Sequence, residues 1–392
     1  MKNGDSFQQQ RRACIRIIGG GAVIVSAGLL TGCHFEAEND EQVHFKGEAD
    51  GDLRKHLLKK AALAPSSHNL QPWLIDLRGS KDSMTLRADP ERLLPVADPY
   101  ARETLISLGC FLEVLSMAVQ ANGNQCEIIL FPDGDEPQLM PIASVIAWIR
   151  IIPLSQPPLP DPLFSMVEQR RTNRRPYELQ RAVSEDILRA LRGVANTHGI
   201  HAAGCVEPSL VKKINHLAAN AWRTEMSNND AVLESLRLTR VGRKEIEAHR
   251  DGIAVSGFLP EMAAIFGLFP RDRVPEPDSA LMLDMIATGE EQAQTAAGWI
   301  WLYSQGNSYA QQIAVGRAFV RLQLAAALYG IAMQPMSYLL SEAPQMQPHR
   351  KEFYAKVGFD PNQYHLQMLV RIGYAASVSA APRRRLNDFI QE

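Results

Sequence analysis

Apolar residues recur along this chain at the spacings of helices and of strands. Leu53, Leu57 and Ala61 lie four residues apart with basic residues between them, which predicts a helix with one apolar face. Residues 102–120 are apolar on most faces, which predicts a buried helix. Further helices are predicted over residues 164–171, after the capping residue Ser184, through most of 208–250 and over 309–329. Strands are predicted over residues 73–77, 126–131, 144–152, 299–303 and 363–372.

The two long apolar helices predict an internal duplication. Gly109 and Gly123 lie in and after the first helix, and Gly316 and Gly330 lie in and after the second. Both pairs are offset by 207 residues (316 − 109 and 330 − 123). A constant offset of this kind is typical of a chain built from two related halves.

Proline-rich and glycine-rich stretches indicate where these halves begin and end. Five prolines between residues 153 and 162 predict a stiff connector. The first half is therefore expected over residues 51–152 and the second over 163–392. Residues 251–277 are apolar and contain both glycine and proline, so we expect an insertion there that forms a lid or cover.

Composition and charge exclude some functions. The chain has 392 residues, enough for two domains, with 46% hydrophobic and 21% charged residues, as in ordinary globular proteins. A net charge of −2 argues against a general nucleic-acid binder. The 5 cysteines form no Cys-x-x-Cys pair and no spacing with histidine that suits a metal, so we predict no metal site.

Residues 1–33 have the pattern of an export signal. Arg11 and Arg12 precede an apolar run of about sixteen residues, which is short for a membrane span and suits a signal sequence. The arginine pair favours the twin-arginine route, although the usual Phe after it is missing. Leu-Thr-Gly-Cys then resembles a bacterial lipobox and predicts a lipid on Cys33, with a plain cleaved signal as the alternative. The acidic residues 34–50 are expected to tether the exported, lipid-anchored protein in the periplasm or cell envelope.

Two short motifs contain the candidate chemistry. Residues 170–177 read Arg-Arg-Thr-Asn-Arg-Arg-Pro-Tyr, with four guanidinium groups in six residues and no acid among them. Guanidinium groups bind phosphate through paired hydrogen bonds, so this stretch suits an anionic small molecule, while a solvated basic loop stays open as an alternative. Residues 64–73 read Ala-Pro-Ser-Ser-His-Asn-Leu-Gln-Pro-Trp, a turn between a predicted helix and a predicted strand.

This turn closely resembles the flavin-contacting turn of the FMN-dependent nitroreductase family, which reads Pro-Ser-x-x-Asn-x-Gln-Pro-Trp. The arginine motif resembles that family's Arg-Arg-Ser-x-Arg segment. The resemblance implies an α+β, nitroreductase-like fold, which is usually a homodimer with FMN between its subunits. Because each motif occurs once, and in opposite halves, the chain looks like a fused pseudo-dimer with one flavin site that functions as a single chain. The order of the motifs and the signal resemble the branch that includes mycobacterial Acg.

The resemblance also implies which residues bind the flavin. The arginine segment would contact its phosphate and pyrimidine edge, the turn would line the other side, N–H groups after Pro335 would face its N5 atom, and the arginines at 383–385 would approach the phosphate. The cofactor-binding candidates are Arg170, Arg171, Thr172, Arg174, Pro65, Ser66, Ser67, Asn69, Met336, Ser337 and Arg384. No catalytic acid or base is implied, because the protein supplies orientation and electrostatics to the flavin.

The implied function is an oxidoreductase that transfers hydride from a donor such as NAD(P)H, through FMN, to a small aromatic or quinone-like acceptor. A protein that stores or sequesters FMN without turnover is an alternative, because residues 251–277 could cover the substrate side and nicotinamide donors are chiefly cytoplasmic. A lipid-anchored scaffold with relict motifs is a third. A hydrolase that uses Ser66 or Ser67 beside His68 is disfavoured, because adjacent Ser and His rarely orient productively and no third orienting residue is apparent.

Overall fold

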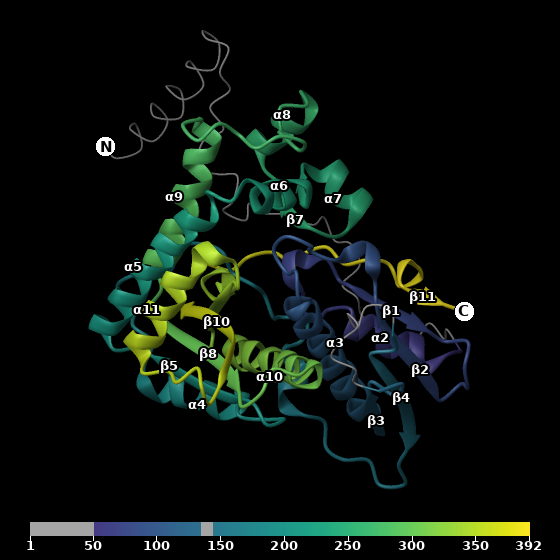
Figure 1. Cartoon of the computed structure of the whole chain (residues 1–392). Coiled ribbons are helices and arrows are strands. Elements are labelled where there is room, and N and C mark those ends of the chain that lie inside the picture. The colour runs from purple at the N-terminus through teal and green to yellow at the C-terminus, as the bar shows by residue number, and fades with distance from the viewer. Residues whose placement is uncertain (1–50, 135–143) are drawn as a thin grey trace, which may run out of the picture.

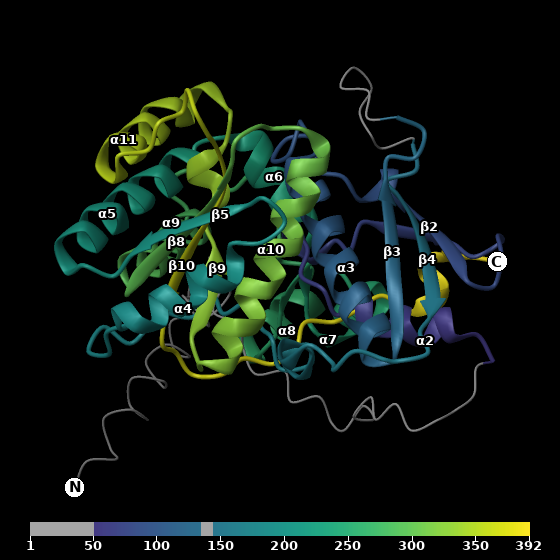
Figure 2. The ribbon, with the colours of Figure 1, turned by 90° about the horizontal axis from the view of Figure 1, so that it is seen from below.

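A computed structural model describes residues 51–134 and 144–392, so the predicted signal, tether and Cys33 lie outside the described residues. Two sheets stand on opposite sides of a central pair of helices, and a smaller unit lies above them (Figures 1 and 2). The helices are α2 (Leu53–Ala61), α3 (Arg102–Ala121), α4 (Glu185–Ala195), α5 (Pro208–Glu225), α6 (Asn229–Arg237), α7 (Arg243–His249), α8 (Phe258–Ile265), α9 (Ala280–Gln294), α10 (Tyr309–Leu328) and α11 (Gln347–Val357). Short 3-10 helices are η1 (Ser67–Asn69), η2 (Pro90–Arg92), η4 (Pro162–Met166), η5 (Ser337–Leu340), η6 (Pro344–Met346) and η7 (Leu386–Asp388). The architecture is α+β.

The first sheet has the strand order β11-β1-β2-β4-β3. Its strands are β1 (Trp73–Asp76), β2 (Ser83–Ala88), β3 (Asn124–Leu130), β4 (Ala147–Pro153) and β11 (Ile390–Gln391). The strands from the first half pair antiparallel, but β11 comes from the end of the chain and pairs parallel with β1, with Ile75 opposite Ile390. The C-terminal segment of the predicted second half therefore crosses over and completes the sheet of the first half.

The second sheet has the strand order β5-β8-β10-β9, and its pairs are antiparallel. Its strands are β5 (His201–Cys205), β8 (Gly298–Ser304), β9 (Ala332–Pro335) and β10 (His365–Gly373). Strand β8 is apolar along almost its whole length and is buried, because helices cover both of its faces.

Helices α3 and α10 cross between the two sheets and form the centre of the core (Figure 2). Gly109 and Gly316 lie at the crossing, and a Cβ atom added to either would collide with the backbone of the other helix. The sequence offset of 207 residues therefore corresponds to a real contact between equivalent positions. Among the described helices, α3 alone has the length and hydropathy of a membrane span, and most of it is buried in this core.

The smaller unit is larger than the insertion predicted over residues 251–277. It contains α6, α7, α8, the strands β6 (Thr239–Val241) and β7 (Ile253–Val255), and the start of α9 (Figure 1). Its own apolar cluster joins residues from before and after the predicted range: Met226, Val232, Leu236, Met282 and Met285. The boundary was missed because the charged surface of α6 and α7 resembles that of any solvent-exposed helix.

Most of the predicted elements are present, but six strands were not predicted: β2, β5, β6, β7, β9 and β11. Of these, β2 pairs with both β1 and β4. Residues 164–171 do not form the predicted helix: the 3-10 helix η4 ends at Met166, and the arginine segment follows it without regular structure. The segment is fixed instead by tertiary contacts, such as the hydrogen bond from Asn173 N–H to the Met333 carbonyl (3.0 Å).

Candidate functional site

A cavity of about 2350 Å³ lies where the two halves and the smaller unit meet. The predicted turn, the arginine segment, the residues after β9 and the C-terminal segment all contribute to its wall. All eleven residues proposed from the sequence line this cavity: Pro65, Ser66, Ser67, Asn69, Arg170, Arg171, Thr172, Arg174, Met336, Ser337 and Arg384. Two motifs that are about one hundred residues apart in the chain therefore line the same cavity.

The turn at residues 64–73 has an unusual backbone. His68, Asn69 and Gln71 have φ values of 47°, 55° and 54°, in the left-handed region that non-glycine residues rarely adopt. The Gln71 N–H donates to Ser66 Oγ (2.9 Å), which closes the turn on itself. Three such residues within four positions are held in place only because the surrounding structure determines their conformation.

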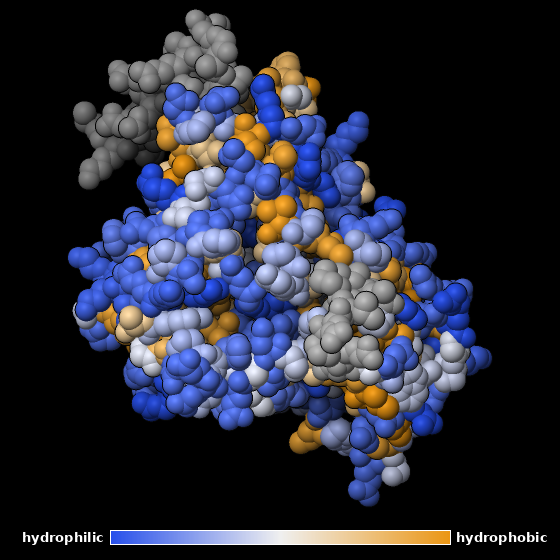
Figure 3. Space-filling view, in the orientation of Figure 1, coloured by the Kyte–Doolittle hydropathy of each residue, from blue (hydrophilic) through white to orange (hydrophobic). Residues whose placement is uncertain are grey.

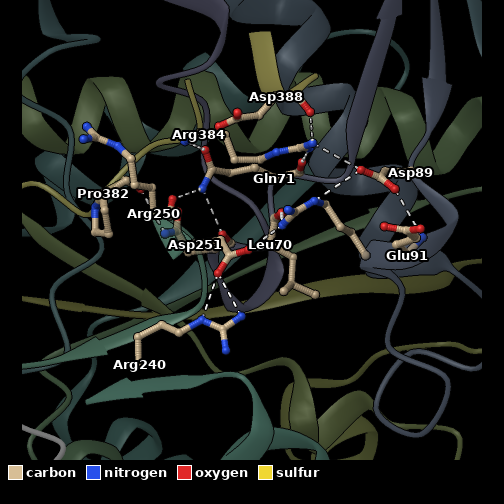
Figure 4. Close-up of polar contacts among 12 residues, drawn as sticks. Leu70, Gln71, Asp89, Glu91, Arg240, Arg250, Asp251, Pro382, Arg384 and Asp388 are labelled. Carbon is tan, nitrogen blue, oxygen red and sulfur yellow. Dashed lines mark hydrogen bonds and ion pairs between the residues drawn. The ribbon is translucent and has the colours of Figure 1, made fainter. Parts of the chain in front are cut away.

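Gln71 connects this turn to two distant segments (Figure 4). Its amide nitrogen donates to the Arg250 carbonyl (2.9 Å), and its amide oxygen accepts from the Arg384 N–H (2.8 Å). Asp251, next to Arg250, is ion-paired with Arg92 (2.6 Å) and Arg240 (2.9 Å). The turn, the smaller unit and the C-terminal segment are thereby joined in one buried polar network. Sequence reasoning recognised Gln71 as part of the motif but gave it no role.

Three arginines gather at one end of the cavity. Arg170 and Arg383 both donate to the Leu63 carbonyl (3.4 and 3.3 Å), and Arg171 donates to the Arg170 carbonyl (2.9 Å). Burial, together with the charge of Arg171, lowers the pKa of Arg170 to about 10. Burial, together with the charges of Arg170 and Arg171, lowers the pKa of Arg383 to about 9. Each guanidinium therefore holds its proton less firmly than usual, because burial disfavours its charge and, for Arg170 and Arg383, the neighbouring arginines are also positive.

None of these three arginines, nor Arg174, forms an ion pair with a carboxylate in the described part of the chain. The Nε atoms of Arg170 and Arg383 are buried without a hydrogen-bond partner there. Burial lowers the pKa of Arg174, which also lies close enough to His68 to lower the pKa of that ring. Buried positive charges without a counter-ion are costly, so this end of the cavity is built for an anion.

Three residues have roles that differ from those predicted. The side chain of Arg384 is committed to the fold, because it donates to the Gln71 carbonyl (2.9 Å) and pairs with Asp89 (3.3 Å). Its neighbour Arg383 reaches the anion end instead, and is not part of a solvated tail. The amide of Asn69 is occupied at both ends, by the Pro382 carbonyl and by the Arg383 guanidinium, so Asn69 positions Arg383.

The residues after β9 also differ in part from expectation. The Met336 N–H donates to the Leu369 carbonyl (2.8 Å) and continues the sheet, so it is not available to a ligand. Ser337 begins η5, and the N–H of a first helical residue has no acceptor within its own helix. Of the two N–H groups predicted to face a ligand, only that of Ser337 fits.

The smaller unit contributes another part of the cavity wall. Its apolar lining residues are Val232, Leu236, Ile246, Val255, Phe269 and Met285, and the charged residues Arg243, Glu247 and Arg250 line the cavity with them. The outer surface of the same unit is also apolar, around α8 at the top of the molecule (Figure 3). Phe258 and Ile265 on α8 are 76% and 71% exposed. A cavity with a cationic end and an apolar wall suits a ligand that is anionic at one end and aromatic at the other.

The turn also contacts the start of α3. The Ser67 hydroxyl lies between the Glu103 carboxyl group, which it contacts closely, and His68 Nδ1 (3.1 Å). The third group that sequence reasoning did not find is therefore present. It does not make a hydrolase triad, because the acid contacts the serine and not the histidine that would have to act as the base.

No protein-family model matches the chain. A Mycobacterium tuberculosis (strain H37Rv) protein named "Putative NAD(P)H nitroreductase Rv3131" is 25% identical over 355 residues, which cover 87% of this chain and 92% of that protein. The protein named "Putative NAD(P)H nitroreductase acg" from the same organism is 31% identical over 86 residues, 22% of this chain and 25% of that protein.

Among solved structures, the FMN-dependent nitroreductase NfnB from Mycobacterium smegmatis in complex with NADPH covers 58% of this chain and 96% of its own. The sequence identity is 19% and the TM-score is 0.36, which is too low to establish a common fold. The relation therefore depends on the sequence likeness, which extends over most of both chains. The chain is therefore similar to proteins named as NAD(P)H nitroreductases, over most of its length for Rv3131 and over about a fifth of it for Acg.

Proposed function

We propose that the protein is an FMN-dependent oxidoreductase of the nitroreductase type. The observation that carries the proposal is the group of buried arginines without carboxylate partners, at the end of a cavity that the flavin-like turn also lines. The extended likeness to proteins named as NAD(P)H nitroreductases supports the same reading.

The residues present fit the phosphate of FMN. Arg170, Arg171 and Arg383 would bind it, because each presents a guanidinium group with no acidic partner in the described chain. A charge-assisted hydrogen bond contributes roughly 1.5–3 kcal/mol, more than the roughly 1 kcal/mol of a neutral one. An anion at this point would also relieve the mutual repulsion of the arginines.

The remaining wall fits the ring system of a flavin and leaves space beside it. Arg174 and Ser337 N–H would hydrogen-bond to ring atoms, and the apolar residues of the smaller unit would pack on a ring face. Ligand pockets are commonly about 300–1,000 Å³, so a cavity of about 2350 Å³ has room for a second molecule. Bound FMN would supply the hydride-transfer chemistry. The protein would bind the flavin, orient the reactants beside it and exclude water.

A direct experiment measures FMN binding by the purified chain without its signal, using visible absorbance and fluorescence quenching. We expect a flavin spectrum and, for Arg170→Ala, an affinity at least tenfold weaker. Arg189→Ala is the matched control, because Arg189 lies on the surface of α4 and pairs with the exposed Asp186. Equal FMN affinity for the wild type, Arg170→Ala and Arg174→Ala would place the binding site elsewhere.

The apolar part of the cavity wall also supports a proposal for the hydride donor and the hydride acceptor. We propose NAD(P)H as the hydride donor and a small nitroaromatic or quinone as the acceptor, because an apolar wall suits a flat aromatic molecule. Anaerobic reduction of the bound flavin by NADH and NADPH tests the donor, and subsequent reoxidation by each acceptor tests the second half of the cycle. A protein that binds FMN but completes neither half would be the storage protein, whose cover is the smaller unit.

We further propose that the protein is exported and anchored by lipid at Cys33. The support is the sequence pattern of residues 1–33, which lie outside the described structure. One acyl chain gives only marginal membrane binding, so the several chains of a lipoprotein are needed for a stable anchor. Cys33→Ser should move the protein from the membrane fraction to the soluble fraction. Unmodified full-length chain in the cytosol of wild-type cells would overturn this localisation.

A further inference from the structure

A chain of hydrogen bonds extends from the start of α3 to the wall of the cavity. It connects the Glu103 carboxyl group, the Ser67 hydroxyl and the His68 ring at Nδ1, and all three residues line the cavity. The other ring nitrogen, His68 Nε2, makes no hydrogen bond to any residue in the described ranges, so it is left for a bound molecule or water.

The side chain of Ser107 helps to hold these hydrogen-bonded residues in place. The Ser67 N–H donates to Ser107 Oγ (3.0 Å), and the Ser107 hydroxyl donates to the Glu103 carbonyl (2.7 Å). His68 has a left-handed φ of 47°, a conformation that places its ring back against its neighbour Ser67. These contacts fix the order of the carboxyl group, the hydroxyl and the imidazole along the cavity wall.

Glu103 and His68, at the two ends of this series of hydrogen bonds, have pKa values that are shifted in opposite directions. Burial and the charge of Asp98 raise the pKa of Glu103 to about 7, helped by Glu225 and opposed by Ser67 and Arg102. Burial and the charge of Arg174 lower the pKa of His68 to about 4. Near neutral pH, Glu103 therefore gains and loses its proton readily, while the His68 ring stays neutral.

We propose that Glu103, Ser67 and His68 form a proton relay that delivers a proton to the molecule reduced in the cavity. This inference rests on the proposed function, which supplies the hydride. His68 is the residue that touches the acceptor, and Ser67 and Glu103 act through it. A hydride acceptor such as a quinone or a nitro group becomes an anion when it receives the hydride, and the relay neutralises that anion.

The proton transfer balances without any further reagent. With Glu103 protonated, its O–H donates to Ser67 Oγ, the Ser67 O–H donates to His68 Nδ1, and His68 Nε2 holds a proton. Nε2 gives this proton to the anion while Nδ1 takes the Ser67 proton and Ser67 takes the Glu103 proton. Glu103 ends as a carboxylate, with Ser67 donating to it and His68 Nδ1–H donating to Ser67, and water restores the lost proton.

The relay predicts a spectroscopic signature that requires neither flavin nor turnover. Because the direction of both hydrogen bonds reverses with the charge of Glu103, the neutral His68 ring should change tautomer with pH. In cofactor-free protein labelled with ¹⁵N-histidine, NMR should show the Nε2–H form at pH 6 and the Nδ1–H form at pH 8. Glu103→Gln should remove this pH dependence, while the surface variant Glu352→Gln should keep it.

Activity of the loaded enzyme provides the second readout. With FMN at saturating concentration, Ser67→Ala should lower kcat for the acceptor at least tenfold, while Ser67→Thr, which retains the hydroxyl, should restore most of it; general acid catalysis typically contributes 10²–10⁴-fold. The kcat of the wild type should fall as pH rises through about 7, and that of Glu103→Gln should be independent of pH there.

Three outcomes would overturn the relay. A His68 tautomer that does not change with pH in the wild type would show that no proton moves along the chain. Equal kcat for Ser67→Ala and Ser67→Thr, with FMN bound in both, would show that the hydroxyl is only structural. The third outcome is that the His68 tautomer changes with pH but the protein binds no flavin. The relay would then have no hydride acceptor to protonate, and it would be the proposed function that is wrong.

Discussion

Gly109 and Gly316 make the same contact with each other's helix. A Cβ atom on Gly109 would lie 2.0 Å from the Ile313 carbonyl oxygen, and one on Gly316 would lie 1.9 Å from the Ile106 carbonyl oxygen. In each case the carbonyl belongs to the residue three before the partner glycine. Reciprocal contacts of this kind are what a two-fold axis produces in a homodimer. The crossing of α3 and α10 therefore has the geometry of a subunit interface within one chain.

Replacement of either glycine should separate the helices. Gly109→Ala should lower the free energy of unfolding by about 1–3 kcal/mol or more, because overpacking against a backbone carbonyl exceeds the gain in helix propensity. Gly193→Ala in α4 is the matched control, since a Cβ there meets no atom within 4 Å. The control should gain about 0.5–1 kcal/mol in denaturant unfolding. A stabilised Gly109→Ala would show that the helices do not touch at this point.

Neighbouring arginines in the C-terminal segment should behave in opposite ways. Arg383→Ala should weaken FMN binding at least tenfold and change the unfolding free energy by less than about 1 kcal/mol, because it removes a buried charge repelled by its neighbours. Arg384→Ala should cost about 2–4 kcal/mol of stability, because it leaves Asp89 and the Gln71 carbonyl without this partner. Isothermal titration and denaturant unfolding separate the two effects. The reverse pattern would return the ligand-binding role to Arg384.

Acid should destabilise the protein through Glu113. Burial acts to raise the pKa of this carboxyl, but His198 and Arg317 outweigh it and bring the pKa to about 2. Since the folded pKa lies below that of the unfolded chain, the stabilisation is present at neutral pH and is lost as pH falls from about 4.5 towards 2. A shift of this size corresponds to about 3 kcal/mol. Glu113→Gln should lower stability at pH 7 and flatten its dependence on pH in that window, unlike Glu352→Gln at the surface.

One chain should bind one flavin. The turn at residues 64–73 and the arginine segment at 170–177 each occur once, and both line the same cavity. A symmetric homodimer would repeat both, but a fused duplication can lose one copy. Flavin released from the saturated, denatured protein should approach one per chain. A value of two would refute the assignment of the motifs to a single site.

The sequence alone determined the elements whose cause is local. Residues 102–120 and 309–329 are apolar over a length that exceeds that of ordinary strands, which favours buried helices. Helices α3 and α10 differ from those two ranges by one residue each. The sequence also predicted an anionic ligand, because guanidinium groups without nearby acids suit an anion wherever the fold places them.

Tertiary structure decided what depends on distant partners. The sequence cannot distinguish Arg383 from Arg384, because identical side chains on adjacent residues differ only in the partners that the fold brings to them: Asn69 for Arg383 and Asp89 for Arg384. The same holds for Glu103, a charged residue at the start of a helix that has no signature of its own until the turn places Ser67 against it. Strand β11 joins the first sheet because the edge of β1 lacks a partner from its own half, which no local pattern reveals. Local free energies fixed the elements and the ligand chemistry, and burial against remote segments fixed which side chains remain available for function.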